Sequence, residues 1–398
     1  MKIHHYIKEE SFSKLIDAYK NKRPLHLKNA LISDAIDSLM SWDQVNGLLR
    51  HARLTAPRFR VHKNGTQIPE IDYTAPRSLR RSDGYNKIVV EKLYEVLRNG
   101  GTLVIDAIDE LCKSLDLFCF YFEQAYSERI QVNAYMSWGT EKGFATHWDD
   151  HDVFIFQISG RKNWFLFGNT RRSPLYTDLH TAESNSAPTD IKWNEVISKG
   201  DILYIPRGEW HHAIALDEPS LHLTFGINCT TGISFYSWLQ EKLTALDIMR
   251  DDLPTLSTNQ EIKEHDKKIK EAIINTLQST FLTEYLQSKK ITHNSRSYFS
   301  LPYAVENQAL PKEENFSVRL NVSFIEDLQI NTAQNVLTFK SAKKTYSFSL
   351  KTKSFFDLML DYQSHPYQEI LNNQDLKKEQ LRNLLSSLVI SGLATIEH

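Results

Sequence analysis

The sequence predicts a mainly β core of the double-stranded β-helix, or jelly-roll, class, followed by a helical segment and a C-terminal winged-helix-like α+β domain. Three observations carry this prediction. Residues 131–228 hold short aliphatic and aromatic runs between turn residues, residues 235–290 have apolar positions at helical spacing, and the chain beyond residue 310 runs from strands into helices.

The N-terminal third is predicted to alternate helices with short strands. A helix is expected at 11–22, with Ser11 as a possible cap, and another at 41–51, where Ser41 and Gln44 form a capping box. Further helices are expected at 85–101, closed by Gly100 and Gly101, and at 109–126, with strands over PLHLKN and TLVIDAID.

The middle of the chain has the pattern of an antiparallel β structure. The strand runs are QVNAYMSW, DVFIFQI, NWFLFG, DILYIP and LHLTFGIN. Turn residues separate them at Ser159-Gly160, Lys199-Gly200-Asp201 and Pro206-Arg207-Gly208. Short strands spaced by such turns are typical of a barrel or jelly roll.

The C-terminal part is predicted to be helical first and then mixed. Helices at 235–290 could form a dimer through their apolar faces or pack as an intramolecular bundle. The strands and helices that follow fit a winged helix, whose expected recognition helix holds Lys377, Lys378 and Arg382 against Glu379. This weak charge favours a packing or protein-docking module, and nucleic acid is not an expected partner.

Composition indicates an ordinary globular protein of two or three domains. The 398 residues are 41% hydrophobic with a formal net charge of −2, so bulk attraction to nucleic acid or membranes is not expected. The cysteines Cys112, Cys119 and Cys229 match no zinc pattern and suit a reducing cytoplasm. Neither a signal peptide nor a membrane helix is expected from the sequence.

A possible metal site lies at the edge of the β region. His147 and Asp149 are two residues apart, so in an extended chain they share a face while Trp148 points away. The third ligand is expected from GDILYIPRGEWHHA, where a turn leads into His211 and His212, and the turn alone admits either. Two histidines and one carboxylate form the facial triad of non-haem Fe(II) oxygenases, which leaves coordination positions open.

The joint pattern raises this prediction above chance, because a lone His-x-Asp is usually structural. THWDDHDVFIFQISGRKNWFLFG, followed by KGDILYIPRGEWHHAIAL and SLHLTFG, resembles the JmjC ribosomal oxygenases, a cupin-type branch of the 2-oxoglutarate oxygenases. Element order extends the resemblance, more weakly, to the whole chain. It implies a JmjC catalytic domain at 1–234, a helical dimerisation domain at 235–305 and a winged-helix-like domain at 306–398.

The resemblance also implies site roles. His147, Asp149 and His211 match the iron ligands of the family. Lys162 stands where the family places the cation that pairs with the distal carboxylate of 2-oxoglutarate, with Arg161 as its rival in the same turn. A buried dianionic acid requires such a fixed positive partner.

Further pocket residues are expected on two strands. The family has an Asn at the position of Asn133, near the co-substrate, and Tyr135 shares its strand face. His222 and Thr224 share a face of another strand and are expected to border the same pocket, unless each is a satisfied polar group inside the barrel.

Three residues are candidates for lining the substrate: His151, His212 and Arg161. His151 shares a strand face with Asp149 and lies either at the pocket mouth or at the surface. Some relatives have a Ser where this chain has Gly226, so a helper hydroxyl is expected to be absent.

The resemblance implies an enzyme that uses Fe(II), 2-oxoglutarate and O₂ to hydroxylate a protein side chain, with arginine or histidine of a ribosomal protein as the family's substrates. Three alternatives stay open: a tailoring hydroxylase of a precursor peptide, an N-methyl-lysine demethylase, and a non-catalytic cupin scaffold. The intact triad together with Lys162 argues against the scaffold.

Overall fold

The structure is a computed structural model that describes residues 2–51, 53–79, 82–180, 186–292, 296–305, 310–322, 329–341, 344–361, 363–373 and 375–398. The chain divides into two compact units, Met1–Cys229 and Thr230–His398. The predicted boundary at 234/235 lies near this division, whereas the one at 305/306 adjoins residues outside the described ranges. The division into three domains stays a prediction.

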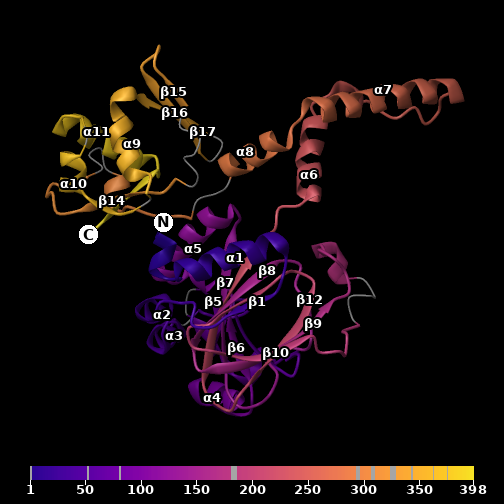
Figure 1. Cartoon of the computed structure of the whole chain (residues 1–398), viewed down its shortest axis with the longest axis vertical. Helices are drawn as coiled ribbons and strands as arrows, with labels where there is room; N and C mark the ends of the chain where they lie inside the picture. Colours follow the sequence, from indigo (N-terminus) through magenta and orange to yellow (C-terminus); the bar gives the residue numbers. More distant parts are fainter. Residues whose placement is uncertain are drawn as a thin grey trace. The chain divides into compact units, whose positions relative to one another are not determined.

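Two β-sheets form the core of the first unit (Figure 1). The eight-stranded sheet has the order β1 (Leu25–Leu27), β11 (Ile202–Ile205), β8 (Asp152–Ser159), β13 (Ser220–Ile227), β7 (Ile130–Ser137), β6 (Thr102–Ile105), β2 (Phe59–Lys63) and β3 (Thr66–Gln67). The three-stranded sheet has the order β10 (Trp193–Ser198), β9 (Arg161–Asn169) and β12 (Glu209–Ala215). All pairings between these strands are antiparallel, as the turn pattern predicts.

The two sheets are joined by a shared apolar cluster. Val153 and Ile155 of β8 pack with Trp164 and Leu166 of β9, and Ile197 of β10 belongs to the same cluster. Successive side chains of a strand point to opposite faces, so one face of β8 serves this interior and the other face is free to meet helices. The predicted jelly-roll core is therefore a two-sheet structure with side chains between the sheets.

Helices cover the outer face of the large sheet. Helix α5 (Lys113–Tyr126) places Phe118 and Phe122 against Phe156 of β8 and Phe225 of β13, with ring centroids 5.2–6.1 Å apart. Edge-to-face aromatic pairs of this kind add to the free energy gained from burial. The rigid outer face holds the inner face of β8 and β13 in a fixed position.

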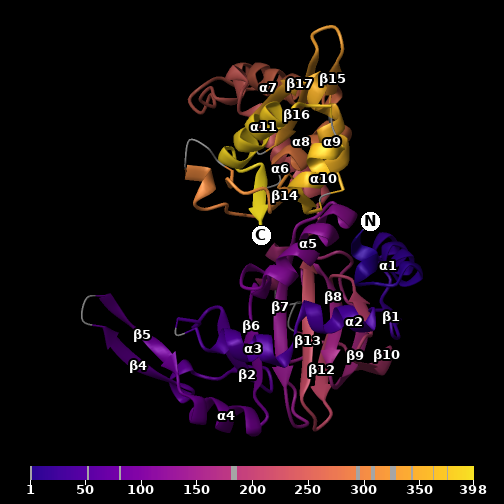
Figure 2. The same cartoon turned by 90° about the vertical axis from the view of Figure 1, so that its left-hand side faces the viewer.

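The remaining helices of this unit are α1 (Glu9–Asn21), α2 (Ser33–Leu39), α3 (Trp42–Leu49) and α4 (Val90–Arg98). The strands β4 (Thr74–Leu79) and β5 (Ser82–Ile88) form a separate hairpin, which extends away from both sheets (Figure 2). Short 3-10 helices lie at Lys2–His5, Glu70–Asp72, Ile108–Glu110 and Tyr176–His180.

Three local predictions in this region need correction. Helix α1 begins at Glu9 with Lys8 at its N-cap, so Ser11 is an internal helix residue and not its cap. The expected helix at 85–101 begins at Val90, because residues up to Ile88 pair with β4 in the hairpin. Ser41 does accept a hydrogen bond from the Gln44 N–H at 3.3 Å, but the reciprocal bond of a capping box is not formed.

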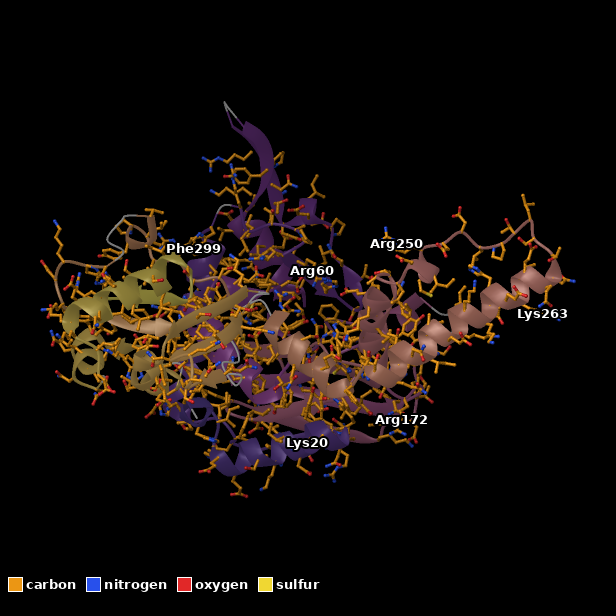
Figure 3. All side chains as sticks on the ribbon, turned by 90° about the horizontal axis from the view of Figure 1, so that it is seen from above. Lys20, Arg60, Arg172, Arg250, Lys263 and Phe299 are labelled. Atoms are coloured by element: carbon orange, nitrogen blue, oxygen red, sulfur yellow. The ribbon has the colours of Figure 1, made fainter. Side chains whose placement is uncertain are left out.

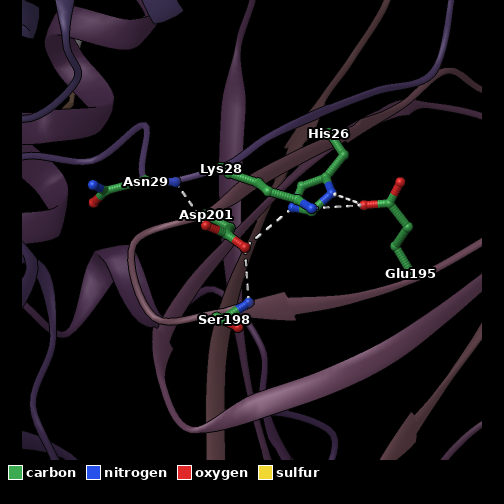
Figure 4. Close-up of polar contacts among 6 residues, drawn as sticks. All are labelled: His26, Lys28, Asn29, Glu195, Ser198 and Asp201. Atoms are coloured by element: carbon green, nitrogen blue, oxygen red, sulfur yellow. Dashed lines mark hydrogen bonds and ion pairs between the residues drawn. The ribbon is translucent and has the colours of Figure 1, made fainter.

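His26, whose side chain is 5% exposed, joins the edge strand β1 to β10 and to the turn that follows β10 (Figure 4). His26 lies with Nδ1 2.9 Å from Glu195 Oε2 and Nε2 3.1 Å from Asp201 Oδ2. Asp201 also accepts hydrogen bonds from the backbone N–H groups of Asn29 and Ser198. Burial opposes the charge on His26, but the two carboxylates outweigh it and raise its pKa.

The second unit begins with helices α6 (Gly232–Leu243), α7 (Asn259–Ser279) and α8 (Leu282–Thr292). Thr231 caps α6 in a capping box with Ser234, and Thr258 caps α7 in another with Glu261. Helix α7 contains no buried residue, and its exposed side chains include Lys263 (Figure 3).

An α+β body follows these helices. Its strands are β14 (Ser317–Leu320), β18 (His365–Pro366) and β19 (Ala394–Glu397) in one sheet, and β15 (Gln329–Asn331), β16 (Val336–Ser341) and β17 (Lys344–Ser349) in another. Helices α9 (Lys353–Met359), α10 (Tyr367–Asn372) and α11 (Lys378–Ile390) share one apolar core with β14, β16 and β19. In the described parts of the chain, no helix is both long and apolar enough to cross a membrane.

Candidate metal centre and pocket

The structure brings the three predicted metal ligands together. His147 lies just before β8 and is bridged to His211 of β12: the His147 N–H donates to the His211 carbonyl at 3.1 Å, and the His211 N–H donates to the His147 carbonyl at 2.7 Å. The two rings have centroids 4.5 Å apart, and Asp149 Oδ2 lies 3.6 Å from His211 Nε2. One potential ligand atom from each residue lies within 4.8 Å of the others.

Backbone carbonyls fix the tautomers of both histidines. His147 Nδ1 is 2.8 Å from the Ala145 carbonyl oxygen, and His211 Nδ1 is 2.9 Å from the Glu209 carbonyl oxygen. A carbonyl can only accept, so each Nδ1 carries the proton and each Nε2 keeps its lone pair. Two imidazole Nε2 atoms and one carboxylate therefore face a common point, which fits a transition metal such as iron.

The electrostatics of the three residues favour metal binding. Burial alone would raise the pKa of Asp149, but the imidazoles of His147, His151 and His211 outweigh it and lower this pKa. Burial lowers the pKa of His211 to about 4, with a smaller contribution from the neighbouring His147. Near neutral pH the site therefore offers an ionised carboxylate and a neutral His211 ring, the protonation states that a ligand needs.

The two cations of the Gly160 turn have opposite orientations. The Arg161 guanidinium is exposed and donates to both carboxylate oxygens of Glu218, at 3.0 and 3.1 Å. Lys162 is only 4% exposed, lines the cavity, and donates from Nζ to Ser137 Oγ at 2.8 Å. Within the described ranges no carboxylate pairs with Lys162, and burial lowers its pKa to about 7.

The triad and Lys162 line one cavity of about 370 Å³. Its floor, which we call the pocket floor, consists of the inward-facing residues of β7, β13 and β8. The register places His222 opposite Tyr135, Thr224 opposite Asn133, and Gly226 opposite Gln131. All four floor residues that the sequence predicts, Asn133, Tyr135, His222 and Thr224, therefore border the cavity.

His222 lies at the Lys162 end of the pocket floor. Its ring stacks on Tyr135, with centroids 4.9 Å apart and the planes 3° from parallel. Burial, and to a smaller extent the charge of Lys162, lowers the pKa of His222 well below its ordinary value. Its Nδ1 is buried and has no hydrogen-bond partner among the described residues, so a polar atom at this end of the cavity is available to a bound molecule.

Asn133 is held by hydrogen bonds within the pocket floor. Its side-chain oxygen accepts from the Ala107 N–H at 3.0 Å and from Gln131 Nε2 at 3.3 Å. Those bonds orient the amide, which leaves its nitrogen side toward the neighbouring Tyr135.

The candidate substrate residues His212 and His151 both border the cavity, but their surroundings differ. His212 also borders the cavity, but its ring stacks on Phe165 at 4.8 Å and its Nδ1 is 2.9 Å from Thr146 Oγ1. Burial lowers its pKa to about 4. His151 borders the cavity with a side chain 35% exposed, so it lies at the mouth and is not a plain surface residue.

The sequence argument missed Ser137, Trp164 and Phe144. Ser137 is two residues beyond Tyr135 on β7, so the same alternation that placed Asn133 and Tyr135 would have found it. Trp164 and Phe144 supply aromatic walls beside the metal ligands, and no spacing rule in the sequence marks them.

Comparison with known proteins agrees with this geometry. Residues 115–234 match the JmjC domain family, which confirms the resemblance that the sequence predicted. Two relatives are named bifunctional lysine-specific demethylase and histidyl-hydroxylase NO66. The Brugia malayi protein is 26% identical over 149 residues, and the Drosophila simulans protein is 34% identical over 116 residues. These matches cover 36% and 27% of this chain but only 21% and 13% of the relatives' own lengths.

Solved structures show the same fold over nearly the whole chain. The Escherichia coli ribosomal oxygenase YcfD in complex with cobalt and succinic acid is 17% identical, with 99% of each chain covered and a TM-score of 0.59. The same protein with cobalt and 2-oxoglutarate is 15% identical, again with 99% of each chain covered, at a TM-score of 0.58. At this identity the likeness establishes the fold alone, which is that of a JmjC cupin with accessory elements.

Proposed function

We propose that this JmjC-domain chain is an Fe(II)- and 2-oxoglutarate-dependent oxygenase that hydroxylates a side chain of a protein or peptide. One observation carries the proposal: a two-histidine, one-carboxylate triad shares its cavity with Lys162, a buried cation that has no carboxylate partner in the described structure. A metal site alone would not require that lysine. A site for a dicarboxylic co-substrate would.

His147, Asp149 and His211 would hold the iron through Nε2, a carboxylate oxygen and Nε2. Bound iron would supply, together with 2-oxoglutarate and O₂, the oxidising chemistry needed to hydroxylate a C–H bond. Lys162, held by its hydrogen bond to Ser137, would bind the distal carboxylate, and His222 and Asn133 would border the same ligand. Trp164 and Phe144 would help to exclude water.

The substrate class is proposed from the relatives. The structural relatives are named ribosomal oxygenases and the NO66 relatives are named histidyl-hydroxylases, which supports a histidine of a ribosomal protein as the target. Arginine is the other target that the family resemblance implies. The same NO66 name includes lysine-specific demethylase, so N-methyl-lysine demethylation is the second candidate function. A tailoring hydroxylase of precursor peptides would use the same site.

Mass spectrometry of treated fractions tests the proposal. Purified protein is loaded with Fe(II) and incubated with 2-oxoglutarate and matched ribosomal and peptide fractions, and both succinate and the mass change of each peptide are measured. A gain of one oxygen atom supports hydroxylation, and loss of a methyl group supports demethylation. If no fraction yields succinate and 2-oxoglutarate does not bind, the chain is a non-catalytic scaffold.

We also propose that the chain forms a homodimer through its helical segment. Helix α7 buries no residue within the chain, yet exposes Ile262, Ile274 and Leu277. Nearby, Phe281 and Leu282 are also exposed. Apolar side chains that remain exposed along one helical segment mark a surface for association.

The remaining assignments are proposals of the same kind. The catalytic, helical and winged-helix-like domains at 1–234, 235–305 and 306–398 are supported by the order of elements in the second unit, where α6, α7 and α8 come first and a body of strands with α9, α10 and α11 follows. A reducing compartment such as the cytoplasm is supported by the free thiols of Cys112, Cys119 and Cys229.

A further inference from the structure

The end of the cavity away from Lys162 is lined by a different set of residues from the lysine end. Ser137, the partner of Lys162, pairs with Ser220 of β13, whereas Gln131 pairs with Gly226 farther along the same strand. The pocket floor therefore runs from the lysine, past the metal ligands, to a mouth at Gly226. We call this end, lined by His151, Gln131, Gly226 and Asn228, the cavity mouth.

Gly226 leaves the space that the His151 ring occupies. A Cβ atom at position 226 would lie 2.9 Å from His151 Cδ2, closer than real Cβ contacts, and 3.1 Å from His151 Nε2, which is tighter than most, so the ring would have to shift. The backbone of Gly226 is not in the left-handed region, so its conformation does not call for glycine. Glycine within a strand often marks the close approach of another group. Here that group is the imidazole of His151.

Asp150 fixes the orientation of the ring. His151 Nδ1 lies 2.9 Å from Asp150 Oδ1, and an ionised carboxylate only accepts, so Nδ1 carries the proton of that bond. His151 Nε2 has no hydrogen-bond partner in the part of the chain that the structure describes. Asp150 thus holds the ring through Nδ1, Gly226 leaves the space that the ring occupies, and Nε2 has no hydrogen-bond partner among the described residues.

We propose that His151 is a specificity-determining residue, which hydrogen-bonds the polar group of the target side chain, and that Gly226 lacks a side chain so that the ring can take this place. The inference rests on the proposed oxygenase function. The amides of Gln131 and Asn228 border the same mouth. A site that hydrogen-bonds its substrate discriminates strongly against an analogue without the polar group. The substrate class is therefore a peptide residue with a hydrogen-bonding side chain, not an aliphatic one.

A set of four variants tests this arrangement: His151→Ala, His151→Gln, Gly226→Ala and the double variant His151→Ala/Gly226→Ala. The substrate is a peptide library with one varied central residue, and oxygen gain at that residue is measured together with the affinity for 2-oxoglutarate. Wild-type protein is expected to oxidise polar central residues and not Leu, Ile or Val.

His151→Ala is expected to raise the KM for the preferred peptide about tenfold, as the loss of one hydrogen bond predicts. His151→Gln, which keeps a hydrogen-bonding group, should recover part of that loss. Gly226→Ala should resemble His151→Ala because it displaces the ring, and it should add nothing further in the His151→Ala background.

The outcomes separate the two proposals. If wild-type protein oxidises the library and His151→Ala retains the same KM and the same preference, this inference is wrong while the oxygenase function stands. Additive effects of His151→Ala and Gly226→Ala would equally overturn it, because they would show that the two positions act separately. If wild-type protein releases no succinate with any peptide and binds no 2-oxoglutarate, the oxygenase function fails, and this inference fails with it.

Discussion

Replacement of Lys162 by methionine is the most direct test of the co-substrate site. The substitution keeps most of the side-chain volume and removes the buried ammonium group, which donates to Ser137 Oγ at 2.8 Å. A bound dicarboxylate would then leave one carboxylate buried without its cation. Removal of one partner from a buried ion pair costs about 3–5 kcal/mol, so the Kd for 2-oxoglutarate should rise roughly 150- to 4,000-fold.

The pH dependence of 2-oxoglutarate binding is a second, independent test of whether Lys162 pairs with the bound carboxylate. Burial lowers the pKa of this lysine from 10.5 to about 7 in the free pocket, and a bound carboxylate would raise it again. Binding then takes up a proton wherever the pH lies between the two values. The affinity of wild-type protein for 2-oxoglutarate should therefore be full below about pH 7 and fall as the pH rises above it.

The assay is isothermal titration calorimetry with Mn(II) in place of Fe(II), under anaerobic conditions, across neutral and alkaline pH. Lys162→Arg keeps a permanent charge and should bind with little pH dependence, if the longer side chain fits. Arg161→Ala is the matched control, since Arg161 is exposed and paired with Glu218. An unchanged Kd for Lys162→Met, or a large loss for Arg161→Ala, would refute the assignment.

Three further predictions follow from other parts of the structure. His211→Ala should abolish metal-dependent turnover, whereas His212→Ala should keep most of it, since the ring of His212 stacks on Phe165. Metal content and succinate release are measured for each variant. The reverse result would mean that His212 is the third ligand. His26→Gln should lower the free energy of unfolding by about 1.5–3 kcal/mol near pH 6, where the ring is charged and both carboxylates are ionised, because it removes charge-assisted hydrogen bonds. Because the pKa of His26 is raised on folding, this stabilisation is full just below the ordinary value of 6.5 and is lost as the pH rises through the raised value. The free energies of unfolding of wild type and variant, measured in urea, should therefore become equal at alkaline pH. A difference that does not change with pH would contradict this reasoning. Ile274→Glu should shift a dimer toward monomer in light scattering without loss of metal binding, and Lys263→Glu, which changes only an exposed charge on the same helix, is its control.

Much of the fold followed from local pattern. The alternation and turn residues between 131 and 228 predicted strands β7, β8, β9, β11 and β13, because a sheet that is buried on one face constrains every second residue. The hairpin of β4 and β5 was missed, since residues 85–89 have apolar positions that also suit a helix. These residues form a strand because they pair with β4. Strand pairing is a tertiary contact, which the local propensity of a segment does not predict.

Two of the three metal ligands could be predicted from local spacing, and the third could not. His147 and Asp149 could be paired from spacing alone, because both lie in one short extended segment. His211 could be chosen over His212 only by family resemblance, since the pairing of β12 with β9 shifts register between Glu209 and His211. A β-bulge of this kind re-aims the side chains that follow it, and a sequence does not show where it falls.

From residue identity and spacing the sequence predicted the pair His147 and Asp149 as metal ligands, and its resemblance to the JmjC oxygenases added His211 and a cation for a dicarboxylic acid. Only the tertiary structure decided which cation faces the cavity, because the direction of Lys162 depends on the register of β9 between β10 and β12. Only the structure placed the His151 ring against Gly226, from segments far apart in the chain. Identity and spacing are properties of the chain, whereas burial and contact arise when distant strands pack.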